Sequence, residues 1–220
     1  DDGVHIAVAA ACSVKHVRVS VQARLTSVPL HGGWRFDVAA GRKEIVARVI
    51  GANELAVIGL LGDVGDAQAA YEAVDRDGDG VREYAQKFAS TPGQKDGLWW
   101  DAEKEKEPSP LGVEVDDLLD DLAKHPDPDN TVYGYRWRLL KGQGAKAPGG
   151  AFSYVINGNQ VAGFAVVAAP SAYRKTGVMT FLMAKNGKIY QKDLGEQGAD
   201  LVKAMEVYEI DETWTLQTTD

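Results

Sequence analysis

The sequence predicts an α+β fold, in which a long helix in the N-terminal half packs on a C-terminal antiparallel β meander. Two observations lead to this prediction. Over residues 41–74, apolar side chains recur at helical spacing with charged residues between them. In the second half, the pairs Asn157-Gly158 and Asn186-Gly187 each separate two apolar runs. Asn-Gly favours the positive φ angles of a tight hairpin turn.

Short strands are expected before the helix. Residues 17–25 alternate apolar and polar side chains, which is typical of a strand with one face in water. Gly32-Gly33 then predicts a turn into a second short strand, residues 34–37. We therefore divide the chain into an N-terminal strand segment, residues 1–38, and a main α+β domain, residues 39–220.

Glycines interrupt the predicted long helix. Each glycine in a helix interior costs roughly 1 kcal/mol relative to alanine, so Gly62 and Gly65 predict a break or kink. The Asp-rich residues 75–80 predict a turn that ends the helix, and residues 81–89 predict a further helix. A short amphipathic helix is expected at residues 115–122, because leucines and aspartates occupy its opposite faces.

The meander is predicted from five runs, residues 133–140, 152–156, 160–168, 178–184 and 188–190. We expect them to form one antiparallel sheet. Trp137, Phe164 and Phe181 are expected in the core between this sheet and the long helix. Residues 199–208 predict a closing helix.

Composition limits the function classes. The chain has 220 residues, 45% of them hydrophobic, which is typical of a globular protein. Its 32 acidic against 24 basic residues give a net charge of -8. The sequence has no basic patch of the kind that would indicate a nucleic-acid partner. No uninterrupted apolar run reaches the roughly 18 residues of a membrane helix, so we expect no transmembrane segment.

The chain has one cysteine, Cys12, so no intramolecular disulfide can form. The residues before it, Val8-Ala9-Ala10-Ala11, are similar to a lipoprotein cleavage site. The alternative interpretation is a small residue in a strand.

The motif Asp75-x-Asp77-x-Asp79-Gly80 is the strongest candidate for a metal site. Three carboxylates at alternate positions can bind calcium, and the glycine allows the bend. An EF-hand loop also needs a bidentate carboxylate at its twelfth position, and Gln86 stands there. The alternative is a turn, in which the aspartates accept backbone N–H groups. We expect mainly the turn, with any calcium site weak.

No residue pattern predicts catalysis. The Gly-x-Ser-x-Gly motif of many hydrolases is absent. The glycine-rich residues 142–150 lead into a strand, whereas a phosphate-binding loop leads into a helix. We therefore predict no catalytic residue and no organic cofactor, and a hairpin connection at residues 142–150.

An ordered set of motifs nevertheless carries a resemblance. It includes Gly32-Gly33-Trp34-Arg35-Phe36-Asp37, Asn53-Glu54-Leu55, the run from Asp75 to Tyr84, Asp96-Gly97-Leu98-Trp99-Trp100, Gly149-Gly150-Ala151-Phe152 and Gly177-Val178-Met179-Thr180-Phe181. Over roughly residues 32–214 the chain resembles the bacterial family called domain of unknown function 2950. The resemblance implies export, and hence a periplasmic or extracellular location, and it implies no established activity. It also implies that residues 1–38 are the remnant of an NTF2-like part.

A second likeness is to the globular heads of type IV pilin-like proteins, which share the order of long helix, loop and meander. Three hypotheses about function follow. The first is a non-catalytic structural or protein-interaction subunit of the bacterial cell envelope, with other envelope proteins or a membrane-associated assembly as partners. The second is a calcium- or ligand-binding module using Asp75, Asp77 and Asp79. The third is an enzyme of unknown type.

Overall fold

The computed structural model describes residues 9–14, 17–22, 38–112 and 131–218. The helices are α1 (Val38–Glu72), α2 (Ala102–Glu105), the 3-10 helix η2 (Gly195–Gln197) and α4 (Gly198–Ala204). The strands are β1 (Ala9–Val14), β2 (Val17–Gln22), β3 (Thr131–Val132), β4 (Tyr135–Leu140), β5 (Gly142–Gln143), β6 (Phe152–Ser153), β7 (Val155–Ile156), β8 (Asn159–Gln160), β9 (Ala165–Pro170), β10 (Thr180–Ala184), β11 (Ile189–Lys192), β12 (Val207–Tyr208) and β13 (Thr215–Leu216). This arrangement confirms the predicted α+β fold.

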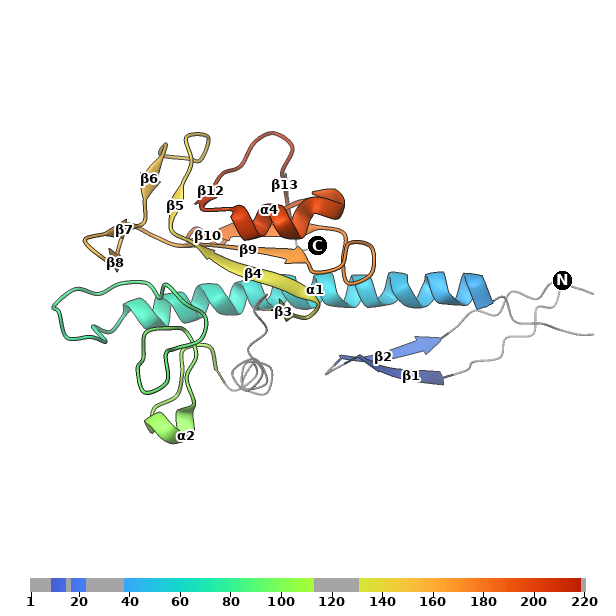
Figure 1. Ribbon diagram of the computed structural model, residues 1–220, viewed down its shortest axis with the longest axis horizontal. Coiled ribbons are helices and arrows are strands. Elements are labelled where there is room, and N and C mark those ends of the chain that lie inside the picture. The colour runs from blue at the N-terminus through green and yellow to red at the C-terminus, as the bar shows by residue number, and fades with distance from the viewer. Residues whose placement is uncertain (1–8, 15–16, 23–37, 113–130, 219–220) are drawn as a thin grey trace, which may run out of the picture.

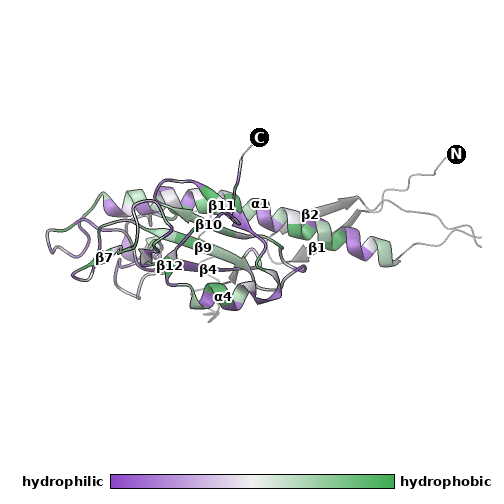
Figure 2. Cartoon of the chain, turned by 90° about the horizontal axis from the view of Figure 1, so that it is seen from above, coloured by the Kyte–Doolittle hydropathy of each residue, from purple (hydrophilic) through white to green (hydrophobic). Residues whose placement is uncertain are grey.

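The main sheet has six strands in the order β13-β11-β10-β9-β4-β3, and all its neighbouring strands are antiparallel. α1 covers one face of this sheet and α4 covers the other (Figure 1). The two central strands, β9 and β10, are therefore buried on both faces, which explains why they are apolar without alternation. Figure 2 shows these apolar strands between the more polar edges.

Alternate residues of the central strands enter two separate cores. Val166, Ala168, Phe181 and Met183 face the core on the α1 side. Leu182, and the residues of β9 and β10 that alternate with the four just named, face a second core beneath α4. The predicted core positions of Trp137, Phe164 and Phe181 are confirmed, because all three belong to the α1-side core.

α1 runs without interruption from Val38 to Glu72, so the predicted break at Gly62 and Gly65 is wrong. The helix is held by packing, which outweighs the intrinsic cost of the glycines. Val57, Leu61 and Val64 are at most 1% exposed beneath the sheet. A Cβ added at Gly65 would lie 3.5 Å from Met183 Cε, so this glycine sits against the sheet.

Two further predictions of secondary structure are wrong. Residues 81–89 form no helix, because the Tyr84 N–H donates to Gln160 O of the distant strand β8 at 2.9 Å and not to a carbonyl of its own segment. The C-terminal half is also not one sheet. β12 pairs in parallel with β5, and β7 and β8 form a ladder of their own.

Both Asn-Gly pairs lie in hairpins, with different turns. Asn157 and Gly158 have φ of 52° and 95° and join β7 to β8, as a two-residue turn requires. Between β10 and β11 only Gly187 has a positive φ, 71°, and its N–H donates to Ala184 O at 2.9 Å. The second connection is therefore longer than predicted.

The N-terminal segment contains the antiparallel hairpin of β1 and β2, in which Cys12 lies opposite Val19. The predicted strand at residues 34–37 and the predicted helix at residues 115–122 lie outside the described residues. The closing helix is confirmed as α4, although it ends at Ala204. The domain division after residue 38 and the NTF2-like origin of residues 1–38 stay predictions.

α1 is also the one helix, among the residues that the structure describes, with the length and composition of a membrane span, from Ala39 to Glu72. Arg48 and Glu54 interrupt its apolar runs, so the sequence contains no uninterrupted apolar stretch of that length. Core helices of soluble proteins meet the same criterion, and the C-terminal half of α1 packs beneath the sheet. The absence of a transmembrane segment stays a prediction.

Candidate functional site

The predicted metal-binding residues lie together in the turn that follows α1. Asp75, Asp77 and Asp79 are exposed, and each offers a carboxylate oxygen within 4.8 Å of the others. This convergence of three carboxylates is what the sequence motif predicted.

The carboxylates also accept backbone N–H groups, as the turn interpretation predicts. Asp75 Oδ1 accepts from Gly78 at 2.8 Å, and its Oδ2 accepts from Gly80 at 2.9 Å. Asp79 Oδ1 accepts from the Val81 N–H at 2.7 Å. The bonds from Gly80 and Gly78 lower the pKa of the Asp75 carboxyl below its usual value.

The second half of the loop differs from an EF-hand, because its side chains bond to the β7–β8 hairpin. Glu83 accepts the Gln160 N–H at 2.8 Å, and Gln86 Nε2 donates to Gly158 O at 2.7 Å. Asp79 Oδ2 accepts from Asn159 Nδ2 at 2.6 Å. Residues that could complete a calcium shell thus already hold the loop against the hairpin.

The Arg76 side chain points from the loop toward the core and holds the loop there. Its guanidinium carbon lies 5.0 Å from the ring centroids of both Tyr71 and Trp100, and its Nη1 lies 3.2 Å from Glu107 Oε1. Hydrogen bonds from Lys95 and from Arg76 lower the pKa of the Glu107 carboxyl. Cation–π contact and ion pairing therefore direct Arg76 inward, while its aspartate neighbours face water.

Two polar residues of α1 fasten the connection between β9 and β10. Glu54 Oε1 accepts the N–H groups of Val178 at 2.9 Å and Met179 at 3.0 Å. Asn53 Nδ2 donates to Thr176 O at 2.8 Å. These residues belong to a motif that carries the family resemblance. In the structure they form hydrogen bonds to the main chain of the β9–β10 connection.

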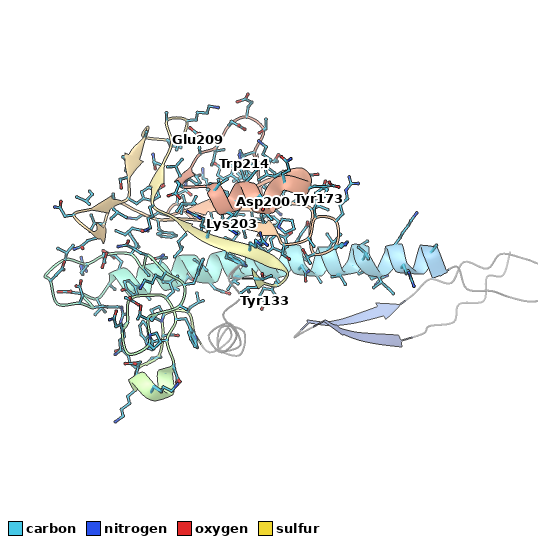
Figure 3. The ribbon with its side chains drawn as sticks, in the orientation of Figure 1. Tyr133, Tyr173, Asp200, Lys203, Glu209 and Trp214 are labelled. Carbon is cyan, nitrogen blue, oxygen red and sulfur yellow. The ribbon has the colours of Figure 1, made fainter. Side chains whose placement is uncertain are left out.

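The glycine-rich residues 142–150 form a hairpin connection, as predicted, because β5 pairs with β6. Gln143 Nε2 donates to the carbonyls of Pro148 and Gly150, both at 2.7 Å. Glu209, labelled in Figure 3, accepts the Lys146 N–H at 3.2 Å.

Two of the hollows on the surface of the described part of the chain bear on function. The first, of about 370 Å³, lies between the segment 86–89 and β4, and we call it the β4 groove. Its lining residues are Gln86, Lys87, Phe88, Ala89, Trp137, Arg138, Leu139, Lys141 and Glu206. The second, of about 430 Å³, lies between α1 and the β10–β11 hairpin and includes Asp66, Tyr84, Phe164 and Lys185 in its lining.

Sequence reasoning identified neither hollow. The β4 groove combines residues from three distant segments, which no linear motif can show. One sequence feature could have indicated the groove. Arg138 and Lys141 follow Trp137 at the end of a strand whose apolar residues are predicted to lie in the core.

Comparisons with curated proteins and with solved structures give no match. The likeness to pilin-like heads therefore stays a prediction. A family model described as protein of unknown function (DUF2950) matches residues 11–216. The chain therefore belongs to this family, as its motifs predicted.

Proposed function

We propose that the protein is a non-catalytic, extracytoplasmic subunit of the bacterial cell envelope that acts by binding other proteins. The location rests on the export that the family resemblance implies. The absence of catalysis is supported by how Asn53, Glu54 and Gln68 are used. Each of these side chains bonds to backbone groups of a distant segment, so they serve the architecture of the domain.

One observation carries the interaction role. α1 continues beyond the sheet (Figure 1), and none of its residues from 39 to 52 is buried. Ile45, Val46 and Val49 lie on this part, and Leu55 just after it is 72% exposed. Helices in water gain most of their stability from packing, so an apolar helix segment without buried residues favours a protein partner.

Photo-crosslinking in the native host tests this proposal. A photoreactive residue at Val46 or Leu55 is expected to give discrete crosslinks to envelope proteins, and the chain to fractionate outside the cytoplasm. Leu201, an exposed residue on α4, is the matched control site and is expected to give none. A cytoplasmic location, or crosslinks of equal yield at Leu201, would refute the proposal.

Calcium binding is the second candidate function, because Asp75, Asp77 and Asp79 bring their carboxylates together. It ranks second because these oxygens already accept backbone N–H groups and because Glu83 and Gln86 bond to the hairpin.

A further inference from the structure

We infer that the β4 groove binds an extended peptide segment of a partner protein, which adds a strand to the edge of β4 that faces away from β9 and places an acidic side chain at Lys141. This inference rests on the proposed interaction role and assigns it a second surface, separate from α1.

The hydrogen-bond alternation of β4 shows which of its backbone groups point away from β9. The Ser171 N–H donates to Gly134 O at 2.9 Å, in register with the pairing of β4 and β9. In an antiparallel ladder every second residue bonds to the same neighbour, so the even-numbered residues of β4 bond to β9. The N–H and C=O groups of Trp137 and Leu139 therefore point to the opposite edge.

Among the described residues, that edge is covered at both ends and uncovered between them. At one end β3 pairs with β4, with Val132 opposite Tyr135. At the other end the Lys141 N–H donates to Glu206 O at 3.4 Å. Between these points, no described residue forms a backbone hydrogen bond to Trp137 or Leu139 at this edge. The described residues thus leave four backbone groups with which an added strand would pair.

The groove beside this edge has the size and walls of a binding site. Its volume of about 370 Å³ falls within the range of about 300–1,000 Å³ that ligand pockets occupy. The rings of Phe88 and Trp137 meet edge to face with centroids 6.3 Å apart, and both residues line the groove. The segment 86–89 lines the groove together with β4.

The charges in the groove favour an acidic ligand. Lys87 is paired with Asp96, and Arg138 Nη2 lies 2.6 Å from Glu206 Oε1. Lys141 is exposed, and no described residue pairs with its ammonium group. A carboxylate on the added strand would neutralise this cation, whereas a basic side chain would be repelled.

Binding of two synthetic peptides to the purified full chain tests the inference. The probes are acetylated and amidated Glu-Val-Glu-Val-Glu and its matched counterpart Lys-Val-Lys-Val-Lys, and binding is followed by titration calorimetry. We expect the acidic peptide to bind at least about tenfold more tightly. Lys141→Glu is expected to abolish this preference, and Lys188→Glu, an exposed change in the β10–β11 turn, is expected to retain it.

Amide hydrogen exchange separates strand addition from simple charge attraction. On binding, exchange at Trp137 and Leu139 should slow, and N-methylation of the central glutamate of the peptide should abolish binding. Unchanged exchange at both residues, equal binding of the methylated peptide, or no binding of the acidic peptide would each overturn the inference. These outcomes leave the crosslinking at Val46 and Leu55 unaffected, so failure of the groove and failure of the proposed function are distinguishable.

Discussion

Gln68 of α1 is paired with the backbone of Ala85 through both ends of its side-chain amide. Its Nε2 donates to Ala85 O at 2.9 Å, and its Oε1 accepts the Ala85 N–H at 2.8 Å. Both residues are buried, with Gln68 at 0% exposure. This pairing takes the place of a strand neighbour and holds Ala85 against the helix.

Gln68→Ala should therefore leave two buried backbone groups without partners. Since each such group costs about 1–3 kcal/mol, we expect a loss of about 2–6 kcal/mol in the free energy of unfolding. Urea denaturation measures this. Gln94→Ala, at an exposed position in the following loop, is the matched control and should change stability by less than about 0.5 kcal/mol. Equal effects of both variants would contradict the structural role of the pairing.

Two Gly→Ala substitutions should change stability in opposite directions. A Cβ at Gly177 would lie 1.9 Å from Tyr135 Oη, so Gly177→Ala should destabilise the protein by about 1–3 kcal/mol through overpacking. Gly59 lies on the exposed face of α1 with nothing within 4 Å of its added Cβ. Gly59→Ala should therefore stabilise the protein by about 0.5–1 kcal/mol through helix propensity. Thermal melts of both variants check the signs, and a neutral Gly177→Ala would refute the close contact.

Trp137 is expected to be a major contributor to the α1-side core. It is 6% exposed, and its Nε1 donates to Val132 O at 3.1 Å. Trp137→Ala should cost about 3–5 kcal/mol, the usual range for removing a large aromatic side chain from a core. A cost below about 1 kcal/mol in denaturant melts would place this side chain on the surface instead.

The parts of the fold that the sequence predicted are those set by neighbouring residues. The period of α1 and the turn at Asn157-Gly158 depend on local spacing and local backbone preference. Residues 81–89 were predicted wrongly because their conformation depends on Gln68 and on β8, which are distant in sequence. The core beneath α4 was missed because a strand buried on both faces shows no alternation.

The same distinction applies to the candidate sites. The acidic loop was found because Asp75, Asp77 and Asp79 are close in sequence. The β4 groove was not found, because its walls come from residues 86–89, from β4 and from Glu206. The strand edge beside it depends on how β4 pairs with β9 and β3, which no single segment reveals.

Stability should fall at alkaline pH because of buried tyrosines. Burial raises the pKa of Tyr71 from 10.0 to about 12, and burial does the same for Tyr154. The folded state then holds protons that the unfolded state releases between pH 10 and about 12. The free energy of unfolding should therefore fall as pH rises through this window, by up to about 1.4 kcal/mol per pH unit for each tyrosine.

Denaturant melts across this window measure the fall, and Tyr71→Phe should reduce its slope. Below pH 10 both states keep these protons, so the tyrosine contribution should be constant there. An equal slope in the wild type and in Tyr71→Phe would show that the Tyr71 hydroxyl is not protected from titration.

The last prediction concerns Asp75, Asp77 and Asp79, which we expect to form mainly a structural turn with at most weak calcium affinity. Calcium takes about 6–8 oxygen ligands, and tight loops obtain two of them from one carboxylate at the twelfth position. Gln86 stands there and donates its amide to Gly158 O. Micromolar calcium should therefore leave the Tm unchanged. Asp75→Ala should lower the Tm more than Asp77→Ala, because Asp75 accepts two backbone N–H groups at 2.8 and 2.9 Å, whereas Asp77 accepts one at 3.3 Å.

Acid should weaken the same turn. Since the bonds from Gly80 and Gly78 depress the pKa of Asp75 in the folded state, its stabilising effect is present above the unfolded pKa and is lost as pH falls through the folded one. Thermal melts with calcium, with magnesium and with a chelator decide between turn and metal site. A rise of many degrees with micromolar calcium that Asp77→Asn abolishes would make the loop a calcium site, because a ligand that binds only the folded state stabilises it by mass action.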